Sequence, residues 1–309
     1  MKVCILLAAY NGAAYIRKQI DSILQQDYPN IQLVLSDDGS RDGTQEILAE
    51  YEAKYPDKVI WYQSGKRFGK AQTHFMHLLR TFHDAPYIMF SDQDDVWHPD
   101  KVSKTLEKMR EIETDSTVPA LVHTDLRVVD QDLNVKAQSF CEYSNINGYR
   151  LKLNQLLVQN VVTGCTVMIN RTLAELSCAE ISEDAIIMHD WWIALLAAAC
   201  GTLGFLNEAT IDYRQHGNNS VGAKNVRSLS YIWSKFKDNR ILASMQMTFG
   251  QARSFEKCYS AVLADEIRKV IQAYAELERK NAFIRKWTYL KYGFWKFGLL
   301  RKLGQFVRG

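Results

Sequence analysis

Residues 87–97 read Tyr87-Ile88-Met89-Phe90-Ser91-Asp92-Gln93-Asp94-Asp95-Val96-Trp97, an apolar run of strand length that leads directly into three carboxylates. The run has no polar alternation, which predicts a strand covered on both faces, as in a parallel α/β sheet. Two carboxylates about 4 Å apart repel by about 4 kcal/mol at the effective dielectric near a protein surface. Their concentration at the end of a buried strand therefore favours a bound cation, and oxygen donors favour Mg²⁺ or Mn²⁺. The alternative is a solvated acidic turn before a helix that begins near Pro99.

Length and composition narrow the class of protein. A chain of 309 residues can form one large α/β domain with an appendage, or two small domains. The apolar fraction of 47%, the charged fraction of 24% and the net charge of +3 are ordinary for a globular protein and do not indicate nucleic-acid binding. The six cysteines include no C-x-x-C pair, which predicts reduced thiols in a cytoplasmic protein and no structural zinc. The first apolar run, Val3–Ala9, is interpreted as a strand rather than a signal peptide, and the longest, 191–206, is too short for a membrane helix.

Strand-type and helix-type patterns alternate through the first part of the chain. Strands are predicted at Val3–Ala9, 31–36, 58–62 and Tyr87–Ser91, and helices at 13–26, Thr44–Lys54, 71–80 and 99–112. Such alternation predicts right-handed βαβ crossovers and a parallel sheet with helices on both faces. In sheets of this kind ligands bind outside the carboxyl ends of the strands.

The turns that follow the four strands are therefore expected to share one rim. They are Tyr10-Asn11-Gly12, Asp37-Asp38-Gly39-Ser40, Gly65-Lys66-Arg67-Phe68-Gly69-Lys70 and Asp92-Gln93-Asp94-Asp95. These turns supply carboxylates that can bind a nucleobase, a ribose or a metal ion, and cations that can lie near a diphosphate. Together they predict a nucleotide pocket. The G-x-G-x-x-G fingerprint is missing after the first strand, which argues against an NAD-dependent dehydrogenase. Taken alone, the second turn is equally well explained by turn formers with Thr44 as a helix cap, and the basic turn by a solvated face.

The pattern changes from about residue 118. Short strands are predicted at 120–125, 126–130, 202–206 and 210–214, and a longer β-rich run at 158–170. Met188-His189-Asp190-Trp191-Trp192 opens a helix that reaches Cys200, with Gly201 in the stop position. Asp190 is either an N-cap or, if desolvated, a proton acceptor. His216 follows in a polar turn and is either a surface residue or a metal ligand.

Helical periodicity dominates beyond residue 225, and the tail is basic. Residues 281–309 contain seven Lys or Arg and no Asp or Glu, with aromatic residues between them. This pattern favours a helix that lies on an anionic membrane surface. A core helix, an oligomer contact and a nucleic-acid patch are the alternatives.

Four motifs, in order, resemble the family 2 glycosyltransferases with the GT-A fold. Ala9-Tyr10-Asn11-Gly12 is similar to the opening TYN turn, residues 37–44 to the DDGSxDGT loop, and Asp92-Gln93-Asp94-Asp95 to the D-x-D metal site. His189-Asp190-Trp191-Trp192 resembles the segment that carries the catalytic base. Two positions depart from the family pattern: Ala9 stands where Thr is frequent, and His189 where an acid usually precedes the base.

The last of these segments points to a subgroup. Together with residues 213–219, the D-x-D and His189 segments look most like the rhamnosyltransferase-type members, which build bacterial surface polysaccharides on the cytoplasmic face of the membrane. The Q-x-x-R-W signature of processive synthases is absent. The resemblance therefore implies a non-processive enzyme that is peripheral on the inner face of the plasma membrane, with no nucleic-acid partner and with a homo-oligomer left open.

The resemblance also implies a fold and its division. We expect an α/β GT-A fold with a Rossmann-like, mainly parallel sheet flanked by helices, and a C-terminal helical extension. Residues 1–222 would form the transferase domain, with a nucleotide-binding half at 1–117 and an acceptor half at 118–222. Residues 223–309 would form the helical, basic and aromatic C-terminal region.

The implied activity is metal-dependent inverting transfer of a sugar from a nucleoside-diphosphate donor, with dTDP-rhamnose as first choice, to a saccharide acceptor that is lipid-linked. Asp190 would be the catalytic base, and Asp94, Asp92 and His216 would hold Mn²⁺ or Mg²⁺. The donor would contact Ala9, Tyr10, Asn11, Asp37, Asp38, Lys66, Arg67, Asp92 and Arg214. The acceptor side would be shaped by Thr163, Gly164, Cys165 and Trp191.

Three alternatives remain open at this point. A UDP-hexose donor would use the same fold. A glycoside hydrolase also uses carboxylates, but it needs two facing acids and no diphosphate site. A non-catalytic nucleotide-binding or membrane-scaffold protein is opposed by the joint presence of Asp38, Asp94 and Asp190.

Overall fold

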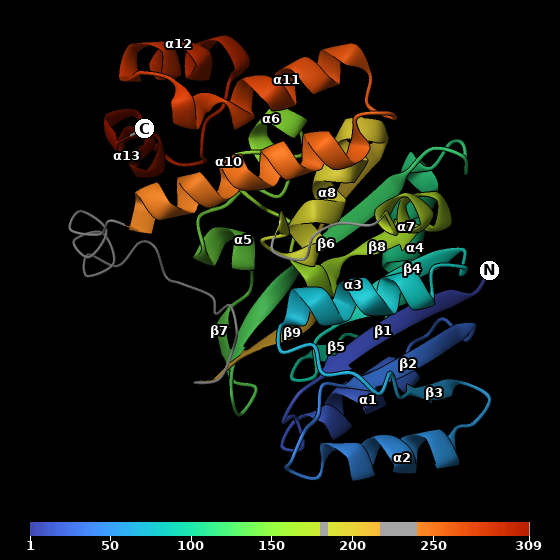
Figure 1. Ribbon diagram of the computed structural model, residues 1–309. Coiled ribbons are helices and arrows are strands. Elements are labelled where there is room, and N and C mark those ends of the chain that lie inside the picture. The colour runs from blue at the N-terminus through green and yellow to red at the C-terminus, as the bar shows by residue number, and fades with distance from the viewer. Residues whose placement is uncertain (180–184, 217–239, 309) are drawn as a thin grey trace.

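A mixed sheet runs through the part of the chain that the computed structural model describes, which is residues 1–179, 185–216 and 240–308 (Figure 1). The nine strands have the order β3-β2-β1-β4-β8-β6-β9-β5, and β7 pairs with β6. The strands are β1 (Val3–Ala9), β2 (Ile31–Asp37), β3 (Val59–Tyr62), β4 (Tyr87–Ser91), β5 (Val96–Trp97), β6 (Ala120–Asp130), β7 (Val135–Ala137), β8 (Met168–Asn170) and β9 (Thr202–Gln215).

Helices cover both faces of this sheet (Figure 1). In the first part of the chain they are α1 (Ile16–Leu24), α2 (Thr44–Lys54), α3 (Ala71–Thr81), α4 (Lys101–Ile112), α5 (Phe140–Tyr143), α6 (Leu153–Leu156), α7 (Arg171–Ser177) and α8 (His189–Cys200). The last part holds α10 (Arg240–Tyr259), α11 (Asp265–Ala275), α12 (Ala282–Tyr292) and α13 (Leu299–Arg308). The short 3₁₀ turns are η1 (Gly164–Thr166) and η3 (Leu277–Arg279).

Strand direction divides the sheet into two parts. The pairs β3–β2, β2–β1 and β1–β4 are all parallel, as the alternation of strand and helix predicts. Beyond β4 the sheet is mixed: β8 is antiparallel to β4 and β6, whereas β6 and β9 are parallel. Helix α8 makes the long crossover that a parallel pair requires. The carboxyl ends of β1, β2 and β4 therefore lie at one edge.

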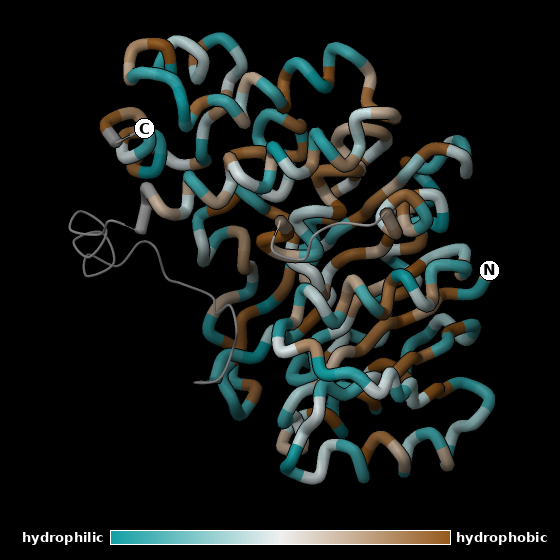
Figure 2. Tube along the Cα trace, in the orientation of Figure 1, coloured by the Kyte–Doolittle hydropathy of each residue, from teal (hydrophilic) through white to brown (hydrophobic). Residues whose placement is uncertain are grey.

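Apolar side chains alternate between the two faces of the central strands. On β4, Ile88 and Phe90 join the core under α3 and α8, while Tyr87 and Met89 join the core under α1 and α4. This follows from the period-2 geometry of a strand buried on both faces. In Figure 2 the hydrophobic residues are concentrated along these strands. The apolar run at residues 87–91 predicts this pattern.

The periodicity of the sequence predicts most of the helices and strands, but the long β-rich run predicted at residues 158–170 is wrong. Only Met168–Asn170 is a strand there. The backbone before it is satisfied by side chains instead of a ladder: Asn160 bonds both the N–H and the C=O of Val162, and the carboxylate of Asp190 accepts from the Gly164 N–H. Elsewhere two predicted pairs of short strands merge into the long β6 and β9, whose pairing shifts register where the breaks are predicted.

The C-terminal helices pack against the core of the α/β domain. Tyr289 and Phe294 are fully buried and share one apolar cluster with residues of α8 and α10. The tail is two helices rather than one, because Gly293 and Gly298, at φ of 68° and 88°, allow the turn between them. The domain boundary predicted at residue 222 and the motif residues 217–219 lie outside the described residues. None of the described helices is both long enough and apolar enough to cross a membrane.

Candidate active site

The turns after β1 and β2 form one hydrogen-bonded unit. The Asn11 N–H donates to the Ser40 hydroxyl at 2.7 Å, and the Asn11 side chain accepts from the Arg41 N–H at 3.0 Å. The Gly12 N–H donates to Thr44 Oγ1 at 2.9 Å. Thr44 is thus not the predicted helix cap, since the N-cap of α2 is Gly43. Its hydroxyl instead joins the two loops that are expected to border the donor.

The acidic pair Asp37 and Asp38 organises the loops around it. Asp37 Oδ2 accepts from the N–H groups of Gly39 and Ser40, both at 2.9 Å, which is the turn interpretation of this motif. Asp38 is buried, and its carboxylate accepts from the Phe68 N–H and, at 2.7 Å, from the Gly69 N–H. Asp38 therefore anchors the basic loop after β3 to the rim of the sheet.

An exposed aromatic and cationic face lies beside this anchor. Tyr10 is 47% exposed, and Arg67 donates to its hydroxyl at 3.1 Å with the guanidinium 5.6 Å from the ring centre. Lys66 is exposed next to Arg67, whereas Ala9 is buried at the end of β1. The two basic side chains are placed where an anionic ligand could meet them.

Gln93 joins the β4 loop to the β1 loop. Its amide donates to the Tyr10 C=O at 2.9 Å and accepts from the Tyr10 N–H at 2.7 Å. A Cβ atom at Gly12 would lie 2.3 Å from Gln93 Oε1, so a larger residue at this position would displace the Gln93 amide. The sequence motif contains Gln93, but local pattern does not reveal that its side chain reaches the other loop.

The acids after β4 meet Asp190 from α8. Burial, followed by the negative charges of Asp94 and Asp190, raises the pKa of Asp92 to about 7. Asp95 is fully buried, and burial, followed by the negative charges of Asp94 and Asp92, raises the pKa of its carboxyl well above the usual range. The acids after β4 and Asp190 of α8, which are far apart in sequence, thus form one negative cluster.

Asp94 and His216 form the outer part of this cluster. His216 Nε2 lies 2.7 Å from Asp94 Oδ2, and the ring of Tyr15 stacks on His216 with centroids 4.7 Å apart. Arg214 is buried: its Nε donates to the Asp94 C=O at 2.7 Å and its guanidinium lies 4.8 Å from the Tyr15 ring centre. The geometry therefore gives Arg214 a role in shaping the loop, and the diphosphate contact predicted for it stays a prediction. Tyr15 was not singled out from the sequence.

A deeper group lies behind these residues. One ligand atom each of Asp92, Asp95 and Cys165 lies within 4.8 Å of the other two. Cys165 is fully buried, and burial raises the pKa of its thiol well above the usual value. Cys165 thus lies against the acidic cluster, and its predicted place on the acceptor side stays a prediction. Lys101 is buried nearby, where burial lowers its pKa to about 7 while Cys165 and Asp95 oppose the fall.

These residues fit a divalent cation. Asp94, Asp92 and His216 supply carboxylate oxygens and one imidazole nitrogen, a set that suits Mn²⁺ and accepts Mg²⁺. Asp95 Oδ2 is buried and has no hydrogen-bond partner within the described residues. Buried carboxylates with raised pKa values and no cationic partner in contact are stabilised when a cation neutralises them.

Asp190 is held in a defined position in the first turn of α8. Its Oδ2 accepts from the Gly164 N–H at 2.8 Å and its Oδ1 from the Asn160 amide at 3.1 Å. Burial raises the pKa of Asp190 to about 7, although these hydrogen bonds and one from the Trp191 N–H oppose the rise. The N-cap of α8 is Met188, so the N-cap alternative for Asp190 is wrong.

The residues around Asp190 are held by close packing and by hydrogen bonds to the backbone, and the acceptor role predicted for Thr163, Gly164 and Trp191 stays a prediction. A Cβ atom at Gly164 would lie 2.8 Å from His189 Nε2, so the approach of η1 to α8 requires glycine. His189 is buried against Phe75, with ring centroids 4.4 Å apart, and burial lowers its pKa to about 3. The Trp191 indole donates to the Leu156 C=O at 2.6 Å. Thr163, which precedes Gly164, uses its C=O to accept from Thr166.

Comparison with known families decides the class. The profile described as glycosyl transferase family 2 matches residues 4–176. The chain belongs to this family. It is therefore a glycosyltransferase, and the glycoside-hydrolase and non-catalytic alternatives are set aside. The family match spans β1 to α7, which includes the turn after β4 but not Asp190 at the start of α8 or His216 after β9.

Two relatives of this glycosyltransferase carry functional names. The chain is 29% identical over 238 residues to the dTDP-rhamnosyl transferase RfbG of Shigella flexneri, covering 70% of this chain and 74% of that protein. It is 27% identical over 249 residues to the putative teichuronic acid biosynthesis glycosyltransferase TuaG of Bacillus subtilis, covering 80% and 92%. The rhamnosyltransferase-type resemblance is thereby confirmed.

Solved glycosyltransferases share the fold. TarS 1-349 of S. aureus, in complex with UDP-GlcNAc, superposes with a TM-score of 0.58 at 16% identity, covering 94% of this chain and 80% of that chain. The mannosyltransferase PcManGT of Pyrobaculum calidifontis, in complex with GDP-Man and Mn²⁺, superposes with a TM-score of 0.53 at 17% identity, covering 99% and 87%. The predicted GT-A class is confirmed.

Proposed function

We propose that this enzyme is a metal-dependent, inverting glycosyltransferase that moves one sugar from a nucleoside-diphosphate donor to a hydroxyl group of a growing bacterial surface polysaccharide. The observation that carries the proposal is the position of Asp190, whose pKa is raised to about 7, beside the acidic loop after β4. A general base works best when its pKa is close to the operating pH.

Asp190 would accept the proton of the acceptor hydroxyl as that oxygen attacks the anomeric carbon. A single displacement assisted by one base inverts the configuration at that carbon. Asn160 and the Gly164 N–H hold the carboxylate by separate oxygens, which fixes its orientation. Each oxygen of an ionised carboxylate has more than one acceptor site, so these bonds leave room for the incoming proton.

The donor would lie across the rim formed by the β1, β2 and β4 loops. The exposed Tyr10 ring would pack against the nucleobase of the donor, and Lys66 and Arg67 would face its diphosphate. Asp38 would act by holding the basic loop, with Asp37 and Asn11 shaping the neighbouring turn. Asp94, Asp92 and His216 would hold Mn²⁺ or Mg²⁺, which when bound supplies Lewis-acid stabilisation of the leaving diphosphate.

The donor that we propose first is dTDP-L-rhamnose. It is supported by the resemblance to the relative named dTDP-rhamnosyl transferase. A UDP-hexose is the alternative, supported by the fold shared with the TarS complex with UDP-GlcNAc. For the acceptor we propose a lipid-linked saccharide at the inner face of the plasma membrane.

A thermal-shift panel tests the proposed function. The full chain is melted with dTDP-rhamnose, UDP-glucose, UDP-GlcNAc and GDP-mannose, each with and without Mn²⁺ or Mg²⁺. One sugar nucleotide is expected to raise Tm by several degrees only when a cation is present, because a ligand at 100 times its Kd stabilises the fold by about 2.7 kcal/mol. Inorganic phosphate is the control. If no nucleotide sugar raises Tm with either cation, the proposal is refuted.

We also propose that the tail binds an anionic membrane surface. Seven apolar side chains on α12 and α13 are each more than half exposed: Leu300 and six that lie at helical spacing, which are Phe283, Trp287, Leu290, Leu299, Leu303 and Val307. Their spacing places three on one face of each helix. Exposed apolar faces of this kind mark interaction surfaces.

Charge selects lipid as the partner of these faces. Residues 281–309 carry seven basic side chains and no acidic one, and each basic residue near an anionic leaflet is worth about 1 kcal/mol. The Lys291 ammonium lies 4.9 Å from the Trp287 ring centre, a cation and aromatic pairing suited to the headgroup region. The basic and aromatic residues of the tail therefore support the proposal of a peripheral membrane enzyme.

Substitution tests the membrane proposal better than deletion, because removal of the tail would also remove the buried Tyr289 and Phe294. The triple variant Phe283→Ser, Leu290→Ser, Leu303→Ser is expected to lower affinity for phosphatidylserine-containing vesicles by at least about 100-fold, since each apolar side chain contributes about 1.5 kcal/mol when buried. Cosedimentation measures this. The matched control is Met247→Ser with Val262→Ser, two exposed apolar residues away from α12 and α13. Equal vesicle binding by the triple variant and wild type would exclude the proposed surface.

A further inference from the structure

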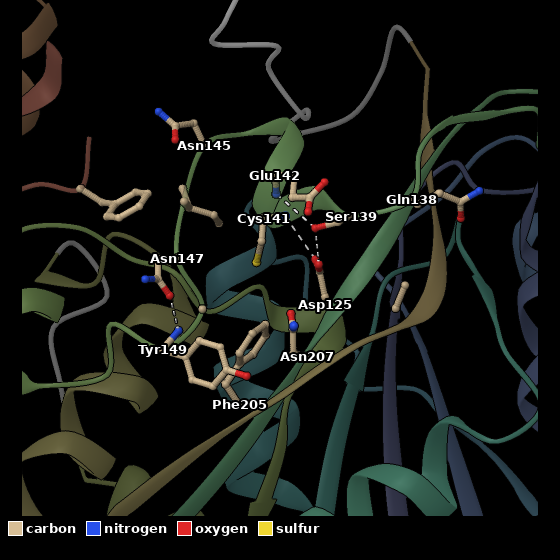
Figure 3. Close-up of a pocket in the computed structure, with 14 residues that line it drawn as sticks. Asp125, Gln138, Ser139, Cys141, Glu142, Asn145, Asn147, Tyr149, Phe205 and Asn207 are labelled. Atoms are coloured by element: carbon tan, nitrogen blue, oxygen red, sulfur yellow. Dashed lines mark hydrogen bonds between the residues drawn. The ribbon is translucent and has the colours of Figure 1, made fainter. Parts of the chain in front are cut away.

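A pocket of about 430 Å³ lies apart from the acidic cluster, between α5, the loop at 145–149 and β9 (Figure 3). Phe297, from the segment between α12 and α13, closes one side. The volume is within the range that small-molecule sites occupy. The catalytic residues that are described above do not line this pocket, so its ligand is a separate question.

The lining is rich in amides and aromatic rings. Asn145, Asn147, Asn207 and Gln138 contribute side-chain amides, and Tyr149, Phe205 and Phe297 contribute rings. An amide offers donors and acceptors together, which suits hydroxyl groups that also do both. A ring offers an apolar face to the C–H side of a pyranose. This combination is what recognition of a sugar residue requires.

Charge excludes an anionic ligand. The lining includes the carboxylates of Asp125 and Glu142 but no Lys, Arg or His. A nucleoside diphosphate or a phosphate would be repelled by these acids and would meet no cationic side chain among the lining residues. Asp125 is buried and accepts from the N–H groups of Leu126 and Cys141, so it shapes the wall. The pocket therefore favours a neutral, hydroxylated ligand.

The aromatic residues differ in rigidity. Phe205 is 6% exposed and packs against the His123 ring at 4.7 Å between centroids, which fixes it as a floor. Tyr149 is 65% exposed, stands edge-on to Phe205 and is placed by its N–H bond to Asn147 Oδ1 at 2.9 Å (Figure 3). Asn207 is exposed, and its amide makes no hydrogen bond within the described parts of the chain. Tyr149 and Asn207 are thus available to a ligand.

Consecutive residues connect the pocket to the base. The Phe297 N–H donates to Gln159 Oε1 at 2.8 Å, and Asn160 donates to Asp190 Oδ1 at 3.1 Å. On the other side Arg301 of α13 donates to the Ser144 C=O at 2.9 Å. Phe297, which lines the pocket, is therefore held by the residue next to Asn160, and α13 is bonded to the residue that precedes the lining loop.

We propose that this pocket binds one neutral sugar residue of the acceptor chain, at a position removed from the hydroxyl group that receives the new sugar. The inference rests on the proposed function, because a transferase that extends a saccharide must hold a saccharide. It adds a second point of contact beyond the transfer site. Such a contact selects acceptors by a sugar already present in the chain.

The experiment uses ligand-observed saturation-transfer NMR on the full chain. The probes are the neutral methyl glycosides of L-rhamnose, D-glucose, D-galactose and N-acetyl-D-glucosamine, with methyl glucuronide as an anionic comparison. At least one neutral glycoside is expected to bind, and the glucuronide is expected to bind more weakly than the glucoside. Tyr149→Ala is expected to lower the affinity for this glycoside by about 2- to 10-fold, which is the contribution of one aromatic contact. Tyr149→Phe should retain binding. The double variant Tyr149→Ala with Asn207→Ala should lose at least about tenfold in affinity for the glycoside.

Controls separate this inference from the proposed function. Both substituted residues are exposed, so the variants are expected to keep the wild-type Tm. Asp190→Asn should bind the glycoside as wild type does, and the Tyr149 variant should keep cation-dependent binding of the sugar nucleotide. Failure of nucleotide binding would refute the proposed function alone. Absence of glycoside binding, or binding unchanged in the double variant, would overturn the pocket assignment alone.

Discussion

Replacing Asp190 by Asn is expected to lower kcat for sugar transfer by a factor of about 10²–10⁴, the contribution of a positioned general base. The amide keeps the size of the side chain and can still accept from the Gly164 N–H, but it cannot take a proton. Because the side chain does not contact the donor loops, the Kd for the sugar nucleotide is expected to change little. The measurement is the initial rate of nucleoside-diphosphate release with acceptor present, beside a calorimetric titration of the donor.

The pH profile provides the control. Since burial raises the pKa of Asp190 to about 7, the wild-type kcat is expected to fall as the pH drops below about 7 and to level off above it. The residual rate of Asp190→Asn should lack this dependence. A variant that transfers at the wild-type rate, or one that loses donor binding while its remaining kcat is normal, would remove Asp190 from the role of base.

Replacing Asp94 by Ala is expected to weaken cation-dependent donor binding by at least about 100-fold. Residues that only support metal ligands cost up to about 100-fold when they are mutated, and Asp94 is proposed as a ligand itself. In this variant His216 loses its contact with the Asp94 carboxylate, and the metal site loses one carboxylate ligand. Isothermal titration with the donor found in the thermal-shift panel, with and without Mn²⁺, measures the change. His216→Ala is expected to give a smaller loss in the same direction.

The matched control is Asp100→Asn, which removes a carboxylate that is paired with Lys104 and lies outside the acidic cluster. It should bind the donor as wild type does. If Asp94→Ala retained donor binding that still required Mn²⁺, the cation would have to be held elsewhere. Asp92, Asp95 and Cys165, whose ligand atoms lie within 4.8 Å of one another, would then be the residues to test.

The amino-acid sequence by itself determined the parallel half of the sheet and the place of the acidic residues. Strands β1 and β4 and helix α2 have the bounds that their periodicity predicts, because apolar runs of strand length and 3.6-residue spacing are local properties. Parallel strands then bring their carboxyl ends to one edge. That rule was sufficient to predict that Asp38 and Asp94 would share a rim.

Tertiary structure alone decided how the side chains at that rim are used. Arg214 holds the Asp94 carbonyl, Gln93 bridges two loops, and Cys165 lies among the acids, and each contact joins residues far apart in the chain. The same cause explains residues 158–170, where long-range bonds to Asp190 replaced a strand, and the tail, whose inner face became core. Periodicity reports which way a side chain faces, but the partner it meets there depends on how distant segments pack, and no local pattern contains that information.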